Sequence, residues 1–200
     1  MQHERILIAG PTGALEIAVE GAATPRALAL VCHPHPLFSG TMDNKVVTTL
    51  SKAFEELGCA VVRFNFRGVG KSEGGYDEGR GEVDDANAAL MHLQRICGET
   101  LPVLLSGFSF GSFVAANLAQ QVPHRKLVLV GPAVSRFALP SVAAETVVIH
   151  GELDDVVPLA DVLNWARPQA LPVTVFPGSG HFFHGQLVAL KLTVKQACQF

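Results

Sequence analysis

The sequence predicts an α/β fold in which a mostly parallel sheet carries helices on both faces. Short apolar runs alternate with segments whose apolar residues recur at helical spacing. Strands that alternate with helices favour parallel pairing, and right-handed crossovers make such a sheet doubly wound. The chain has 200 residues, 48% of them hydrophobic, so we expect one domain with a sizeable core over residues 1–200.

Eight short segments are predicted strands. Residues 5–9 and 14–20 flank Gly10-Pro11-Thr12-Gly13 and are expected to form an opening β-hairpin. The other expected strands are residues 27–33, 59–66, 102–107, 126–130, 145–150 and 172–176. Because ligands bind at the carboxyl ends of strands in open parallel sheets, functional residues should directly follow strands.

Helices are expected between these strands. From Lys45 the apolar residues recur at helical spacing until Gly58, which suits a left-handed C-terminal cap. A second helix starts near Glu82, whose carboxylate complements the helix dipole, and its apolar positions continue to Cys97. Further helices are expected after Ser109, from Pro158 and from about Gly185.

Charge and hydropathy exclude two classes of partner. Lys and Arg number 15 and Asp and Glu 18, a formal charge of −3, and the chain has no basic run that would bind phosphates. The apolar runs are interrupted well short of the about 18 residues that a membrane-spanning helix needs. We therefore expect neither a nucleic-acid partner nor membrane insertion.

The N-terminus and the cysteines indicate a reducing compartment. The first residues include the acidic Glu4 and few apolar side chains before Gly10, which is unlike a secretory signal, so a cytoplasmic location is expected. The cysteines are far apart, in apolar surroundings, without a Cys-x-x-Cys pair. This pattern is typical of reduced, buried thiols rather than of disulfides or a metal site, and the residues concerned are Cys32, Cys59, Cys97 and Cys198.

The strongest motif is Gly107-Phe108-Ser109-Phe110-Gly111, which matches G-x-S-x-G. It follows a predicted strand and opens a predicted helix, the setting in which a sharp turn exposes a nucleophilic serine. A plain tight turn is the alternative interpretation. The two glycines and the context favour Ser109 as a nucleophile.

A serine nucleophile needs a histidine base that is oriented by an acid, in the chain order serine, acid, histidine. Asp154 and Asp155 lie beyond the strand at 145–150, and we favour Asp154 because it keeps a Gly-x-x-Asp spacing from Gly151. His181 lies on a loop of small residues after the last predicted strand. His184 competes with it, but it is expected to be solvated or to cap the last helix.

An oxyanion hole requires two backbone N–H groups, one of them from the residue after the nucleophile, here Phe110. The other is expected from the loop after an early strand. Pro34 and Pro36 have no N–H, which leaves His35, with Leu37 as the second choice.

Two other patterns are weaker. His33 and His35 form a His-x-His pair, but no third ligand follows at metal spacing, so no metal is expected. Gly70-Lys71-Ser72 is similar to the end of a phosphate-binding loop, but Asn65 stands where that motif needs its first glycine.

With these motifs the chain resembles the α/β-hydrolase fold along nearly its whole length. The elbow at 107–111, the segment from His150 to Asp154 with Val157-Pro158, and Gly180-His181 carry the resemblance, and residues 66–72 are similar to an Arg-Gly-x-Gly-x-Ser turn of that fold. Residues 33–37 and 40–47 are similar to a group of small hydrolases without a lid, although this chain has Ser39 where that group usually has glycine. The resemblance implies a three-layer fold with an eight-stranded sheet whose second strand is antiparallel, and no lid domain.

The resemblance also implies Ser109, Asp154 and His181 as a catalytic triad. We therefore expect a serine hydrolase that cleaves a carboxylic ester or thioester of a small molecule through an acyl-enzyme, without a cofactor, as a monomer or small homo-oligomer. A serine peptidase of the same fold, or a binding protein that has lost catalysis, are the alternatives. Residues 131–144 form only a short connection where larger relatives insert a lid, so the site should be open.

Phenylalanine is over-represented, with 12 Phe against one Trp and one Tyr. Several flank the predicted catalytic residues, and these could form an apolar acyl pocket or simply pack against the sheet. The expected pocket residues are Phe38, Phe108, Phe182 and Phe183.

Overall fold

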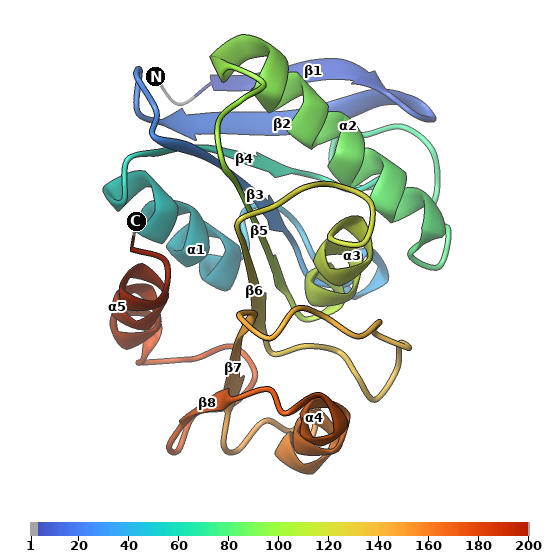
Figure 1. Ribbon diagram of the computed structural model, residues 1–200. Helices are drawn as coiled ribbons and strands as arrows, with labels where there is room; N and C mark the ends of the chain where they lie inside the picture. Colours follow the sequence, from blue (N-terminus) through green and yellow to red (C-terminus); the bar gives the residue numbers. More distant parts are fainter. Residues whose placement is uncertain (1–3, 200) are drawn as a thin grey trace.

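A computed structural model describes residues 4–199 and contains one eight-stranded sheet with the strand order β1-β2-β4-β3-β5-β6-β7-β8 (Figure 1). The strands are β1 (Glu4–Gly10), β2 (Gly13–Gly21), β3 (Ala27–Cys32), β4 (Cys59–Phe64), β5 (Val103–Phe108), β6 (Lys126–Val130), β7 (Val147–Gly151) and β8 (Val173–Phe176). β2 pairs antiparallel with β1 and β4, and the other pairs are parallel. The predicted fold class and the antiparallel second strand are confirmed.

Helices cover both faces of the sheet. They are α1 (Lys45–Glu56), α2 (Arg80–Cys97), α3 (Phe110–Leu118), α4 (Leu159–Ala166) and α5 (Leu187–Ala197), with short 3-10 turns at η1 (Pro36–Phe38) and η2 (Arg167–Gln169). Figure 1 shows α1 and α5 on one side of the sheet and α2 and α3 on the other. Two apolar clusters fill the layers: one lies under α1 and α5, the other under α2 and α3.

The ends of α1 follow from local sequence. The Asn44 side chain accepts a hydrogen bond from the Val46 N–H at the start of the helix, and Gly58, at φ 85°, follows its end. This left-handed conformation is the one predicted for Gly58, and glycine adopts it without the steric cost of a Cβ.

A buried ion pair ties the turn after β4 to α2. The Arg67 guanidinium donates to both carboxylate oxygens of Asp85 and to the Gly81 carbonyl, and the Arg67 N–H also donates to Asp85. Both side chains are buried. The Arg-Gly-x-Gly-x-Ser turn is therefore held rigidly beside the carboxyl ends of the central strands.

Several element boundaries differ from the prediction. The strand expected over 59–66 ends at Phe64, and the last helix starts at Leu187 because residues 181–186 form turns, with Gly185 at φ 77°. The segment between β6 and β7, residues 131–146, contains neither helix nor strand. Within residues 4–199, no helix is both long and apolar enough to cross a membrane. All four cysteines are free thiols, and only Cys97 is partly exposed.

Candidate active site

Ser109 lies on a strained turn between β5 and α3. Its backbone has φ 56° and ψ −119°, a conformation that costs a non-glycine residue about 1–3 kcal/mol. The flanking glycines make the turn possible: a Cβ on Gly107 would lie 2.0 Å from the Gly111 carbonyl oxygen, and one on Gly111 would lie 2.3 Å from the Cys32 carbonyl oxygen. The sequence predicts that both glycines leave room for a sharp turn, and the structure confirms this.

Hydrogen bonds hold the turn in place. The Ser109 N–H donates to the Val130 carbonyl at 2.9 Å, which fastens the turn to β6. The Ser112 hydroxyl lies 2.8 Å from the Gly107 carbonyl and 3.1 Å from the same Val130 carbonyl. The serine side chain therefore projects from a backbone that is fixed at both ends.

Asp154 and His181 form a direct hydrogen bond. His181 Nδ1 lies 2.7 Å from Asp154 Oδ2, and both side chains are buried. The other carboxylate oxygen, Oδ1, accepts the backbone N–H groups of Val156 and Val157 at 2.9 and 2.8 Å. Burial raises the pKa of Asp154, but the hydrogen bonds from His181 and Val157 outweigh it, so the pKa lies below its ordinary value.

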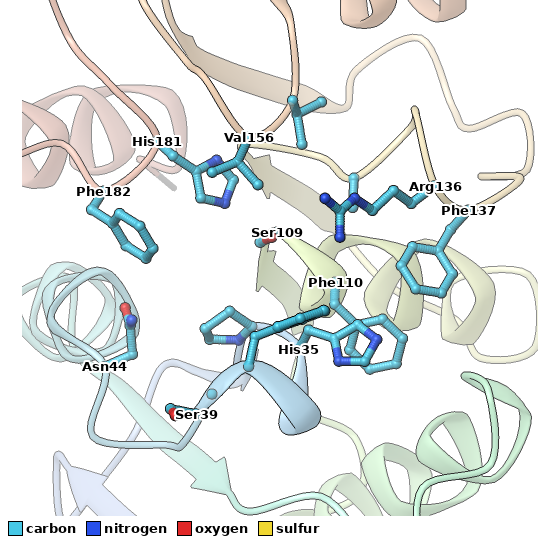
Figure 2. Close-up of a pocket in the computed structure, with 15 residues that line it drawn as sticks. His35, Ser39, Asn44, Ser109, Phe110, Arg136, Phe137, Val156, His181 and Phe182 are labelled. Carbon is cyan, nitrogen blue, oxygen red and sulfur yellow. The ribbon is translucent and has the colours of Figure 1, made fainter.

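This ionised carboxylate determines the tautomer of His181. A carboxylate can only accept, so Nδ1 carries the shared proton, and Nε2 is the ring nitrogen that remains for a second partner. Figure 2 shows Ser109 between His181 and Phe110, with a ring nitrogen of His181 directed toward the serine. Ser109, Phe110 and His181 line the same cavity.

The structure also separates the competing residues. Asp155 is exposed, whereas its neighbour Asp154 is buried against the His181 ring. His184 is exposed, in the turns before α5, and its ring contacts Phe182 rather than the Asp154 pair. Of the two aspartates and the two histidines considered, Asp154 and His181 are therefore the ones that contact each other.

A second histidine, His150, supports the same carboxylate. His150 Nε2 lies 2.8 Å from the Val157 carbonyl oxygen and 3.4 Å from Asp154 Oδ2. A carbonyl only accepts, so Nε2 carries a proton, and burial lowers the pKa of His150, which favours the neutral ring. Its N–H dipole adds to the stabilisation of the Asp154 charge, a contact that the sequence analysis did not anticipate.

The loop after β3 presents backbone N–H groups to the cavity. The Leu37 N–H donates to His35 Nδ1 at 3.2 Å and is occupied. The His35 carbonyl accepts from both the Phe38 and the Gly40 N–H, which curls the loop, and within residues 4–199 no backbone acceptor is found for the His35 N–H. Of the two N–H groups expected from this loop, that of Leu37 is bonded to a side chain, and that of His35 stays the predicted donor.

The cavity beside Ser109 has a volume of about 380 Å³, which suits a small molecule. Its walls come from the loop after β3, the residues around Ser109, the β6–β7 connection and the loops after β7 and β8 (Figure 2). It is mostly apolar. The lining residues are Pro34, His35, Phe38, Ser39, Gly40, Asn44, Ser109, Phe110, Ala133, Arg136, Phe137, Val156, Val157, His181 and Phe182.

Two of the four predicted pocket residues lie elsewhere. Phe38 and Phe182 line the cavity, but Phe108 is fully buried in the sheet core, where its ring lies 4.9 Å from that of His181. Phe183 is also fully buried and packs edge-on against Phe176. Phe183 follows Phe182 directly, and the turn directs the two rings to opposite sides, so only one faces the cavity.

The contribution of the β6–β7 connection to the cavity was not expected from the sequence. Ala133, Arg136 and Phe137 line the cavity from this segment. A signal for it exists in the sequence, because the segment begins at the carboxyl end of a predicted strand, where binding residues gather. The short length of the segment predicts only that a lid is missing there, and says nothing of which side chains face the site.

The two histidines of the His-x-His pair have other partners. His33 is buried between the Pro34 carbonyl and the Phe66 N–H, and the His35 ring packs against Phe110 at 4.9 Å. In the part of the chain that the structure describes, no group of three or more His, Cys, Asp or Glu side chains is placed to hold a metal ion.

This fold and this arrangement of serine, histidine and aspartate define a lidless α/β-hydrolase. The model of the family described as serine aminopeptidase, S33, matches residues 24–169, and the chain belongs to this family.

The chain is also similar to solved structures and to a curated relative. An α/β serine hydrolase homologue from Coxiella burnetii has a TM-score of 0.92 and 40% identity, covering 99% of this chain and 98% of its own. An α/β serine hydrolase without a lid from Xanthomonas campestris has a TM-score of 0.90 and 35% identity, covering 98% and 94%. An uncharacterised protein of Rickettsia prowazekii is 34% identical over 194 residues, 90% of this chain and 82% of its own.

Proposed function

We propose that the protein is a serine hydrolase that cleaves a carboxylic ester or thioester through an acyl-enzyme. The observation that carries the proposal is the Asp154–His181 hydrogen bond of 2.7 Å, which occupies Nδ1 and leaves Nε2 as the ring nitrogen available to Ser109 in the same mostly apolar cavity. A buried, oriented imidazole beside a strained serine is the arrangement that activates a weak nucleophile.

In the proposed reaction, His181 Nε2 takes the proton of the Ser109 hydroxyl as its oxygen attacks the carbonyl carbon. Asp154 stabilises the imidazolium that forms. The tetrahedral intermediate collapses, and His181 gives the proton to the departing alcohol or thiol. Water then attacks the acyl-serine, loses its proton to His181 and releases the acid, and Ser109 recovers its proton.

The proposed oxyanion donors are the backbone N–H groups of Phe110 and His35. Phe110 is the first residue of α3, so its N–H has no partner within the helix and adds to the positive end of the helix dipole. Removing one such donor in a serine hydrolase costs about 10²–10³ in rate. His33 holds the His35 loop in place through its hydrogen bond to the Pro34 carbonyl.

The family description suggests an aminopeptidase as the second candidate. An aminopeptidase must bind the α-ammonium group of its substrate, which requires a carboxylate close to the scissile bond. The cavity lining contains no Asp or Glu, and its one residue with a permanent charge is the cationic Arg136. These observations favour an ester or thioester.

Labelling with a fluorophosphonate probe tests the proposal directly. Wild-type protein should be labelled and should hydrolyse 4-nitrophenyl butyrate, and Ser109→Ala should lose both properties. The matched control is Ser141→Ala, which changes an exposed serine outside the cavity and should keep them. Labelling that persists in Ser109→Ala would identify another nucleophile, and an unlabelled wild type would indicate a non-catalytic protein.

The leaving group is tested with matched substrates. Butyryl esters, butyryl thioesters and aminoacyl 4-nitroanilides, assayed with the same preparation, separate the candidates. Turnover of the anilides above that of the esters would support the aminopeptidase and overturn the assignment.

A further inference from the structure

The cavity beside Ser109 has one unpaired cation, Arg136. Among residues 4–199, no carboxylate lies within ion-pair distance of its guanidinium. The neighbouring Asp161 carboxylate accepts a hydrogen bond from the Ser135 hydroxyl at 2.6 Å instead. By contrast, Arg63 and Arg67 are both paired with acids.

An aromatic ring holds this guanidinium over the cavity. The Arg136 Cζ lies 5.8 Å from the centre of the Phe38 ring, within the range of a cation–π interaction. Phe38 itself is 70% exposed, so its ring is available both to the arginine and to a bound molecule. Figure 2 shows the Arg136 side chain extending from the side of Phe137 with its guanidinium directed into the cavity.

The rest of the lining cannot supply a counter-charge. Ser39, Asn44 and Ser109 are its uncharged polar side chains, and most of the other lining residues are apolar or aromatic. Burial and, less strongly, the positive charge of Arg136 lower the pKa of His35, which favours the neutral ring. A guanidinium that faces an apolar cavity without an acid is a site for a planar anion, because its fork of N–H donors matches a carboxylate.

We propose that the natural substrate is an ester or thioester with an apolar body and a single carboxylate, which Arg136 binds at the mouth of the cavity. This rests on the proposed function, because it assigns the substrate class of the same site. One guanidinium neutralises one negative charge, whereas a phosphate monoester carries about −1.5 to −2 at neutral pH and would be under-compensated. The formal charge of the whole chain is −3, so a preference for anions would not come from its overall field.

Two matched pairs of substrates test the inference and locate the carboxylate. In the first pair the charge is on the acyl part: mono(4-nitrophenyl) suberate and its methyl ester. In the second it is on the leaving group: 4-nitro-3-(butanoyloxy)benzoate and its methyl ester. Wild-type protein should prefer the anionic member of at least one pair by about tenfold in kcat/KM, the effect of a charge-assisted hydrogen bond partly exposed to water.

Variants of Arg136 assign the preference to this side chain. Arg136→Gln should lower the ratio of kcat/KM for the anionic over the neutral ester about tenfold, chiefly through KM, and Arg136→Lys should keep part of it. The matched control is Arg95→Gln, an exposed arginine on α2 outside the cavity, which should leave the ratio unchanged. Added NaCl should reduce the wild-type preference without any substitution.

The outcomes separate this inference from the function on which it rests. Equal turnover of both members of both pairs, or a ratio that is the same in wild type and Arg136→Gln, would overturn the substrate class and leave the serine hydrolase intact. Failure of the fluorophosphonate to label wild type, together with no hydrolysis of any ester, would overturn the serine hydrolase itself.

Discussion

Acidification from pH 6 to pH 4 should destabilise the fold through His33, which is fully buried beside the candidate oxyanion loop. His33 Nδ1 lies 2.6 Å from the Pro34 carbonyl oxygen, and the Phe66 N–H donates to Nε2 at 3.0 Å. The carbonyl requires a proton on Nδ1, and the Phe66 N–H requires a lone pair on Nε2. Protonating Nε2 would place two N–H groups against each other, so the folded protein holds this ring neutral.

The magnitude follows from the pKa. Burial lowers the pKa of His33 from its ordinary value of 6.5 to about 3. Between pH 6.5 and about pH 3 the unfolded chain binds a proton at His33 that the folded protein does not bind, so the free energy of unfolding falls as the pH falls. The contribution is fully present above pH 6.5 and is lost toward pH 3, at about 1.4 kcal/mol per pH unit. From pH 6 to pH 4 the loss is about 2–3 kcal/mol.

Urea unfolding at pH 7, 6, 5 and 4 of wild type and His33→Gln measures this term. The side-chain oxygen of the introduced glutamine can accept the Phe66 N–H, but the amide does not titrate. Wild type should be the more stable at pH 7, and the difference between the two should shrink by about 1.4 kcal/mol per unit below pH 6. Groups common to both proteins, including His150, cancel in the difference. A difference that is constant from pH 7 to pH 4 would refute the reasoning.

Three further predictions concern the turn, the ion pair and the open site. Gly107→Ala should cost about 3 kcal/mol or more in urea unfolding, because its Cβ would lie 2.0 Å from a backbone oxygen, whereas Gly75→Ala, with no atom within 4 Å, should change stability by less than about 0.5 kcal/mol. Asp85→Ala should cost about 3–5 kcal/mol by leaving the buried Arg67 unpaired, while Arg80→Ala, which breaks exposed ion pairs on the same helix, should leave the urea midpoint almost unchanged. Hydrolysis of 4-nitrophenyl butyrate should not rise when lipid vesicles are added, since residues 131–146 form no lid helix; a sharp rise would contradict the open site.

Most of the fold was predictable because its signals are local. Apolar spacing distinguishes helix from strand within a few residues, so all eight strands and the five main helices of the described chain were anticipated, with boundary errors at several ends, among them Phe64 and Leu187. The antiparallel second strand came from the resemblance rather than from periodicity. Boundaries were less certain because turns such as residues 181–186 compete with the helix that follows them.

The candidate nucleophile was predictable for the same reason. Ser109 lies in a turn whose strain and glycines are encoded within five residues, 107–111. Its role as the nucleophile, and the roles of Asp154 and His181 as acid and base, stay predictions. The structure adds that these three residues, each following a different strand, line or adjoin one cavity.

The sequence by itself therefore determined the order of elements and the residue types available at the carboxyl edge of the sheet. Only the tertiary structure decided which side chains face one another: Asp154 rather than Asp155 meets His181, and Phe182 rather than Phe183 lines the cavity. That Arg136 lines the cavity without an acidic partner could not be predicted from the sequence either. Period and propensity act over a few residues, whereas the direction of a side chain in a loop depends on packing against segments far away in the chain.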